Sequence, residues 1–153
     1  MLRLTILAVG KLRPAFREVA DQYLHRLQRY CPAEELEVRE AGKAPTPAEA
    51  LRQEGERLRG KIPSGSYVLA LDREGDAWSS MALATRVGQW RDEGRSVVVL
   101  VGGSHGLDGE LLRGARARWS LGPPTLPHEL ARVVAYEQLY RAWTILRGEP
   151  YHK

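Results

Sequence analysis

Strand-like and helix-like patterns of apolar residues alternate along the whole chain. Continuous apolar runs predict buried strands at 2–10, 66–72 and 95–101, and shorter strands are expected at 35–41 and 118–121. Apolar residues at helical spacing predict helices at 14–30, 46–62, 79–94, 108–118 and 127–147. Because strands alternate with helices and lack a polar face, we expect an α/β fold. Its sheet should be mostly parallel, with helices on both faces.

The expected helices carry recognisable boundary signals. Thr46 followed by Pro47 suits the start of one helix, and Gly94 suits the end of another. The chain shows no internal repeat, no low-complexity segment and no linker-like stretch. We therefore expect a single domain that spans residues 1–153, a length sufficient to bury a core.

The last expected helix is apolar around more than one stripe. Its apolar side chains are Leu130, Val133, Val134, Tyr136, Leu139, Tyr140, Trp143, Ile145 and Leu146. A terminal helix in a small domain cannot easily bury so many internally, and large exposed apolar patches mark association sites. We interpret the helix as a homodimer interface. The alternative is a central helix wrapped by the rest of the domain.

Composition and charge narrow the class of protein only a little. Apolar residues make up 43% and charged residues 27% of the chain, as in ordinary globular proteins. The longest purely apolar run, 97–101, is too short to span a bilayer. A net charge of +4, carried mostly by arginine, suits an anionic partner such as nucleic acid. Cys31 is the only cysteine, so no internal disulfide can form, and a reducing, cytoplasmic setting is expected.

The segment LVGGSHGLDGELL (100–112) has the order strand, glycine turn, helix that is typical of a phosphate-binding loop. Its spacing fits neither common fingerprint. Val101 stands where the dinucleotide motif needs its first glycine, and the Gly-Lys-Ser/Thr ending of a P-loop is missing. Gly102 and Gly103 therefore indicate close backbone approach or a positive φ, either at a ligand or in an ordinary tight turn.

A second loop, LGPPTLPH (121–128), is rich in proline and is expected to be stiff. Pro127 suits the first turn of the following helix, whose free N–H groups can accept an anionic group. We interpret the loop as a preorganised ligand clamp or as a rigid structural corner. The histidines show no metal-ligand spacing, so no metal site is expected. Glu137 and Arg141 are four residues apart, as in a surface ion pair.

Several segments together resemble one protein family. They are LALD (69–72), VGGSHGL (101–107), WSLGPPTLPH (119–128) and RVVAYEQLYRAWTILRGEPYHK (132–153). These segments are similar to the RlmH family, the large-subunit rRNA pseudouridine N3-methyltransferases of the SPOUT superfamily. The resemblance reaches back to LTILAVGK (4–11) and so covers essentially the whole chain. The Gly-Pro-Pro at 122–124 is a local departure, stiffer than this loop need be.

The resemblance implies a C-terminal trefoil knot, a homodimer, and S-adenosylmethionine bound in the knot in a bent form. The cofactor site would be lined by Leu71, Gly102, Leu121, Gly122, Pro123, Pro124, Thr125 and Leu126. A nucleoside cofactor without phosphates would explain why neither phosphate fingerprint is present.

The resemblance also implies a substrate, a pseudouridine of 23S rRNA that is methylated at N3 in the assembled ribosome. Recognition would depend on a basic dimer surface, because the chain has no appended RNA-binding domain. N3 must lose its proton, so a general base or a stabilising cation is needed. The candidates for these catalytic roles are His128, Arg132, Arg141, Tyr151 and His152. Alternatively, Tyr151 and His152 only pack the dimer.

Other functions share parts of this pattern. A SPOUT methyltransferase that acts on tRNA would differ only in its substrate. An RNA-binding dimer without catalysis would share the basic surface but would not need a preorganised cofactor loop. A nicotinamide-dependent enzyme suits the sheet but not the glycine spacing.

Overall fold

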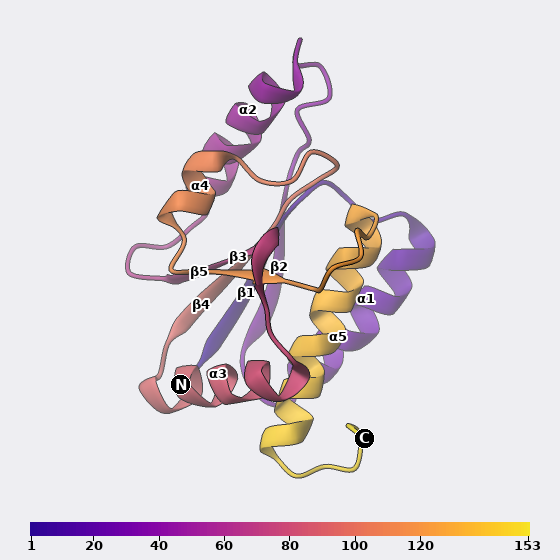
Figure 1. Ribbon diagram of the computed structural model, residues 1–153, viewed down its shortest axis with the longest axis vertical. Coiled ribbons are helices and arrows are strands. Elements are labelled where there is room, and N and C mark those ends of the chain that lie inside the picture. Colours follow the sequence, from indigo (N-terminus) through magenta and orange to yellow (C-terminus); the bar gives the residue numbers. More distant parts are fainter.

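The computed structural model describes residues 1–153, which form a five-stranded sheet and the helices around it (Figure 1). The elements are β1 (Arg3–Val9), α1 (Pro14–Leu27), β2 (Ala33–Val38), α2 (Pro47–Arg59), β3 (Tyr67–Ala77), α3 (Ser80–Glu93), β4 (Ser96–Val101), α4 (Gly109–Gly114), β5 (Ala117–Ser120) and α5 (His128–Leu146). The strand order across the sheet is β2-β1-β4-β3-β5, and every pairing is parallel. The predicted α/β fold with a parallel sheet is confirmed.

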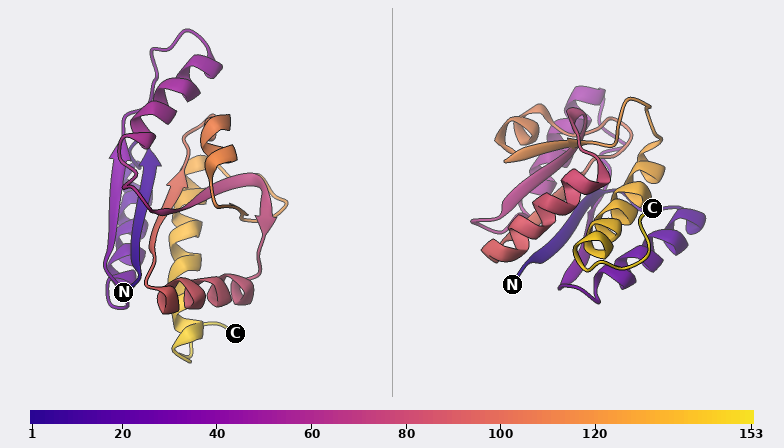
Figure 2. Two further views of the ribbon diagram at one scale, coloured as in Figure 1. Left: turned by 90° about the vertical axis from the view of Figure 1, so that its left-hand side faces the viewer. Right: turned by 60° about the horizontal axis from the view of Figure 1, so that its bottom comes forward.

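Helices cover both faces of the sheet, because successive residues of the central strands point to opposite sides. Leu4, Ile6 and Ala8 enter a larger core of 23 buried residues that also contains side chains of α1, α3 and α5. Leu7 and Val9 enter a smaller core of 9 buried residues, to which α2 and α4 contribute. Figure 2 shows helices on the two sides of the sheet. Burial from both sides explains why the strands are continuous apolar runs in the sequence.

The predicted helix boundary signals act as expected. The Thr46 side chain accepts a hydrogen bond of 3.1 Å from the Glu49 N–H, which caps α2. Gly94 ends α3 in the left-handed region, with φ of 64°. Ser79 caps the start of α3 by accepting from the Ala82 N–H at 3.0 Å.

Three elements differ from the sequence-based prediction, and two of them, β2 and α4, are shorter than predicted. β2 begins and ends earlier than the predicted 35–41, because its last pairing with β1 joins Val38 to Val9 and the chain then leaves the sheet. α4 ends at Gly114, well before the predicted residue 118. The Arg116 N–H already donates to the Val68 carbonyl at 2.8 Å, so pairing of β5 with β3 replaces the last helical turn.

β3 is longer than predicted and bends over β5. Its first half pairs with β5 up to Leu71–Trp119, and after a shift of register Asp76 faces the same Trp119. Gly75 lies against the β5 backbone so closely that a Cβ would be 2.6 Å from the Arg118 carbonyl oxygen. In the view of Figure 1, β5 and the chain after it pass behind the second half of β3. The trefoil knot itself stays a prediction.

The apolar last helix is largely wrapped within the chain. α5 packs between α1 and α3, and the side chains of Val133, Tyr136, Leu139 and Trp143 are buried there. This matches the alternative of a central helix for much of its surface. Leu130 remains 36% exposed, so α5 is not wrapped over its whole surface.

Cys31 is buried against the larger core, and burial raises the pKa of its thiol to about 11. The thiol is therefore protonated at neutral pH and packs as a small apolar group. No helix is both long and apolar enough to cross a membrane.

Candidate functional site

A cavity of about 430 Å³ opens at the carboxyl ends of β3, β4 and β5. Its walls come from four segments: the bend in β3, the loop GGSHG (102–106) after β4, the loop LGPPTLPH (121–128) after β5, and the first turn of α5. We call the two loops the glycine loop and the proline loop. The volume is in the range of small-molecule sites, and parallel sheets bind ligands at this edge. A wider hollow of about 760 Å³ lies at the amino ends of the strands, but none of the predicted site residues lines it.

The glycine loop approaches itself closely. A Cβ on Gly102 would lie 2.3 Å from the Gly106 carbonyl oxygen, a distance that no side chain can adopt. Gly106 has φ of 79° and donates its N–H to the Gly103 carbonyl at 3.0 Å. Close backbone approach therefore explains Gly102, whereas the positive φ belongs to Gly106.

The proline loop presents open backbone donors to the cavity. Gly122, with φ of 121°, donates its N–H to the Ser120 hydroxyl at 3.1 Å. The N–H groups of Leu121, Thr125 and Leu126, all of which line the cavity, donate to no other atom of the chain. A ligand with hydrogen-bond acceptors can therefore be held by this loop without any charged side chain.

Charged groups of both signs line the cavity. The bend in β3 brings Asp72, Arg73 and Glu74 to its wall, and His105 and His128 lie on other sides. Arg73 donates from Nη1 to the Thr125 hydroxyl at 3.3 Å. Positive charge is thus not concentrated here as it is in a site for phosphates.

Sequence reasoning missed the three charged residues of β3, because nothing in DREGDA shows that a strand continues and bends. Gly75 is the one signal that could have pointed to this crossing. The sequence analysis also assigned no role to His105, although this residue lines the cavity.

The predicted cofactor-binding residues come together as a group. All of them except Pro123 line the cavity: Leu71, Gly102, Leu121, Gly122, Pro124, Thr125 and Leu126. Of the predicted catalytic residues, only His128 lines it.

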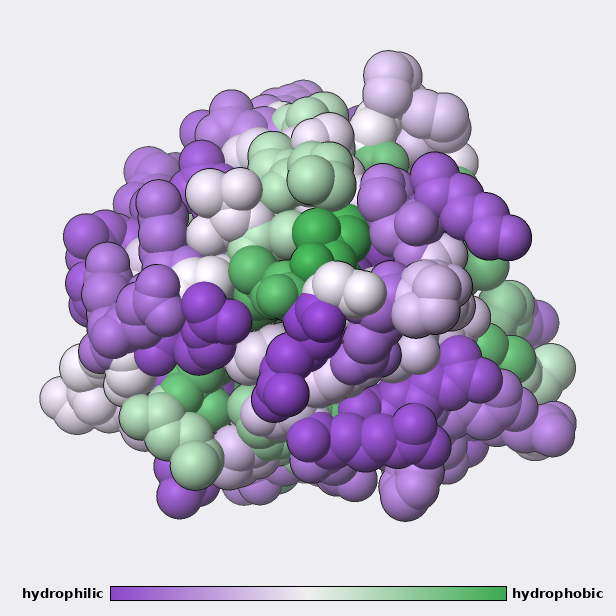
Figure 3. All heavy atoms as spheres, turned by 90° about the horizontal axis from the view of Figure 1, so that it is seen from below, coloured by the Kyte–Doolittle hydropathy of each residue, from purple (hydrophilic) through white to green (hydrophobic).

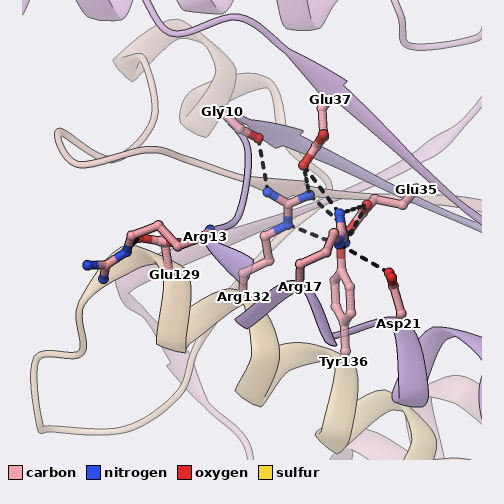
Figure 4. Close-up of polar contacts among 9 residues, drawn as sticks. All are labelled: Gly10, Arg13, Arg17, Asp21, Glu35, Glu37, Glu129, Arg132 and Tyr136. Carbon is pink, nitrogen blue, oxygen red and sulfur yellow. Dashed lines mark hydrogen bonds and ion pairs between the residues drawn. The ribbon is translucent and has the colours of Figure 1, made fainter. Parts of the chain in front are cut away.

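Arg132 lies elsewhere, in a buried cluster of charges between α5 and the ends of β1 and β2 (Figure 4). Its side chain is only 3% exposed and forms ion pairs with Glu35 at 2.9 Å and Glu37 at 2.5 Å. Nη1 also donates to the Gly10 carbonyl at 3.1 Å, and Nε to the Tyr136 hydroxyl at 3.2 Å. Burial acts to lower the pKa of Arg132, but Tyr136 and the two carboxylates outweigh it and raise the pKa. The guanidinium is therefore charged and fully engaged.

A second contact fixes the first turn of α5. Glu129 accepts hydrogen bonds of 2.7 Å from both the backbone N–H and the Nε of Arg13 (Figure 4). The backbone N–H of Arg13, with a further contribution from its guanidinium, holds the pKa of Glu129 below its usual value. Together with Arg132, this contact holds the helical turn that presents His128 to the cavity.

The remaining predicted catalytic residues form a cluster at the other end of α5. Arg141 pairs with Glu137 at 2.6 Å and contacts His152 Nδ1 at 3.1 Å. Tyr151 donates its hydroxyl to Glu137 at 3.0 Å and lies edge-on to Tyr140. Burial, and next its hydrogen bonds to Tyr23 and Glu137, raise the pKa of Tyr151, so the phenol keeps its proton and acts as a donor.

This cluster is distant from the cavity within one chain. Arg141 follows His128 by thirteen residues on one continuous helix, which places them about 20 Å apart along the axis at about 1.5 Å per residue. One copy of the chain therefore does not bring all the predicted catalytic residues together.

Comparisons with known proteins identify the family of this chain. Residues 2–152 match the model of a family described as "Predicted SPOUT methyltransferase". A ribosomal RNA large subunit methyltransferase H from Anaeromyxobacter sp. is 45% identical over 153 residues, covering 99% of this chain and all of that protein. Proteins of the same name from Stutzerimonas stutzeri and Chromohalobacter salexigens are 41% and 43% identical, with the same coverage.

Solved structures show the same fold at low sequence identity. A probable methyltransferase from Bordetella pertussis superposes with a TM-score of 0.58 at 16% identity, over 92% of this chain and 95% of that one. A probable methylase family protein from Haemophilus influenzae gives 0.54 at 11% identity, over 99% of this chain and 70% of that one. The family match and the full-length relatives decide the assignment: this chain belongs to the SPOUT methyltransferase family, in the group of ribosomal RNA large subunit methyltransferase H proteins.

Proposed function

We propose that this chain is an S-adenosylmethionine-dependent methyltransferase that modifies N3 of a pseudouridine in 23S rRNA of the assembled ribosome. The observation that carries the proposal is the cavity at the carboxyl ends of β3, β4 and β5, built from the glycine loop and the proline loop. The relatives that match over their whole length are named as large-subunit rRNA methyltransferases, which supports the substrate class.

The residues of the cavity suit S-adenosylmethionine. Leu71, Leu121 and Leu126 offer apolar walls, and the open N–H groups of the proline loop can pair with acceptor atoms of a nucleoside. Asp72 and Glu74 suit the positive charge of a sulfonium ligand. When bound, S-adenosylmethionine supplies an activated methyl group.

The chain's own residues have two tasks in the reaction. The walls exclude water and align the two reactants, which accounts for much of the rate in a displacement that neutralises charge. We assign acceptance of the N3 proton to His128, which lines the cavity from the first turn of α5. Glu129 and Arg132 bind Arg13 and Gly10, and these contacts fix the helical turn that carries His128.

We call Arg141, Tyr151 and His152 the tail cluster. We further propose that the chain works as a homodimer in which the tail cluster of one copy lies at the cavity of the other and takes part in its reaction. The 20 Å between His128 and Arg141 supports this arrangement, since Arg141, Tyr151 and His152 cannot reach their own cavity. An exposed apolar surface is available as well. Seen from below, the end formed by α3 and the last turns of α5 carries a hydrophobic area among hydrophilic side chains (Figure 3), and Met81 of α3 is 55% exposed.

The transfer reaction tests the proposed function. The protein is incubated with methyl-labelled S-adenosylmethionine and with intact ribosomes that lack the modification, and free subunits and bulk tRNA serve as parallel substrates. We expect label in the large-subunit rRNA of intact ribosomes. Label in tRNA would agree with the proposed cofactor but contradict the proposed substrate. Absence of label from all RNA would contradict the proposed methyltransferase activity.

Mixing two inactive variants tests the shared site. His128→Ala and His152→Ala should each lose activity alone. Equal amounts mixed and allowed to exchange subunits should recover about a quarter of the parental activity, because half of random dimers are mixed and each holds one intact site. Parental activity in either single variant would remove that residue from the site, and lack of recovery would contradict the shared arrangement.

A further inference from the structure

The segment between β2 and β3 projects beyond the carboxyl edge of the sheet (Figures 1 and 2). We call residues 39–59, the β2–α2 loop and α2, the arm. Its loop is tied to its helix, because the Ala41 N–H donates to Glu54 at 3.0 Å and Arg57 donates to the Arg39 carbonyl at 2.7 Å. The arm is therefore an ordered element, about 20 Å long at about 1.5 Å per helical residue.

The arm adjoins the loops that form the cavity. Gly55 of α2 lies directly against the side chain of Asp108, which follows the glycine loop, and Arg59 pairs with the same carboxylate at 3.3 Å. At its other end, the arm starts beside β1, because Val38, the residue before the arm, accepts a hydrogen bond of 2.8 Å from the Gly10 N–H. Gly103 of the glycine loop packs against Val9 of the same strand. The arm therefore lies beside the glycine loop, which forms one wall of the cavity.

Four cations in or next to the arm have no carboxylate partner. Lys11 follows β1, Arg39 follows β2, and Lys43 lies in a tight turn closed by the Ala44 N–H and the Ala41 carbonyl. These three are exposed and Arg57 is half-buried, and none of the four forms an ion pair in the structure. The other arginines of the arm, Arg52 and Arg59, are paired with carboxylates. Lys11, Arg39 and Lys43 are therefore free to bind an external anion, and Arg57 carries no ion pair although it donates to the Arg39 carbonyl.

We propose that the arm docks the phosphate backbone of the large-subunit rRNA through Lys11, Arg39, Lys43 and Arg57. This inference rests on the proposed function, since it takes the RNA that delivers the target nucleotide to the cavity as the partner. Phosphate contacts from lysine and arginine fix the register of a nucleic acid without reading its sequence. The arm thus orients the RNA, while the cavity and the partner's tail act on one nucleotide.

Removing the arm cations in pairs tests the proposal with the full-length protein. K11Q/K43Q and R39Q/R57Q are compared with R91Q/R95Q, which removes the same charge at the amino ends of the strands. For each protein, the affinity for ribosomes is measured as a function of salt, together with the KM for ribosomes, kcat and the affinity for S-adenosylmethionine.

We expect each arm variant to bind ribosomes roughly 10-fold more weakly than the parent. The slope of log Kd against log salt should fall by about 1 to 2, because each lost phosphate contact reduces that slope by about 0.7 to 0.9. The KM for ribosomes should rise, with kcat and cofactor affinity unchanged. An unchanged salt slope in the arm variants, or an equal loss in R91Q/R95Q, would overturn the docking proposal while an active parent leaves the proposed function standing. A parent that neither binds nor methylates ribosomes would overturn both.

Discussion

Gly102→Ala is expected to weaken the binding of S-adenosylmethionine by about 10- to 100-fold, which corresponds to about 1.4 to 2.7 kcal/mol. The new Cβ would lie 2.3 Å from the Gly106 carbonyl oxygen and 2.4 Å from its carbon, and both are backbone atoms that cannot rotate away. The glycine loop must shift, and it forms one wall of the cavity. Calorimetric titration of the cofactor into the variant and the parent measures the effect.

Gly114→Ala is the matched control, because nothing lies within 4 Å of a Cβ at this position, and Gly114, the last residue of α4, does not line the cavity. It should bind the cofactor like the parent. Thermal unfolding shows whether the Gly102 variant is folded. A folded variant with parental affinity would mean that the glycine loop does not shape the cofactor site.

Arg132→Met is expected to lower the free energy of unfolding by about 3 kcal/mol, at the low end of the range for breaking a buried ion pair. The substitution removes one of the two cations that neutralise Glu35 and Glu37 and leaves only Arg17, 2.7 Å from Glu35 and 3.6 Å from Glu37. Glu35 is only 10% exposed. The substitution also frees the Gly10 carbonyl and the Tyr136 hydroxyl. Urea unfolding measures the change.

The control for this variant is Arg91→Met, which removes only an exposed pair with Asp92 and should cost no more than about 0.5 kcal/mol. Arg132→Lys keeps the charge but not the fork of donors, so its stability should fall between those of the parent and Arg132→Met. If Arg132→Met unfolds at the same urea concentration as the parent but transfers no methyl groups, Arg132 acts in the reaction and its structural role here is wrong.

Hydrophobic patterning was sufficient to predict the sheet. The runs around Ile6 and Val99 are buried from both faces, and this burial is what an unalternating strand reports. The second half of β3 could not be predicted in this way, because DREGDA is polar and its position depends on contact with β5, a segment some forty residues later in the chain. Gly75 allows that contact, but a single glycine does not reveal its partner.

Part of the candidate site could likewise be predicted from the sequence, and part of it could not. The glycine and proline loops follow directly from predicted strands, so their meeting at one edge of the sheet was foreseeable from a parallel topology. The environment of Arg132 was not, because its partners Glu35 and Glu37 come from a strand nearly a hundred residues earlier. Local sequence cannot distinguish an arginine that faces a ligand from one that neutralises buried carboxylates. The spacing of His128 and Arg141 on one helix, in contrast, could be read from the sequence once the helix was known to be continuous.

The position of the transferred methyl group tests the central claim most directly. Ribosomes with pseudouridine and ribosomes with uridine at the target position are incubated with the protein and labelled S-adenosylmethionine, and the large-subunit rRNA is digested and analysed by mass spectrometry. We predict one labelled nucleotide, a pseudouridine methylated at N3, and no label when uridine replaces it. Label on another nucleotide, or equal label on both kinds of ribosome, would contradict the proposed reaction.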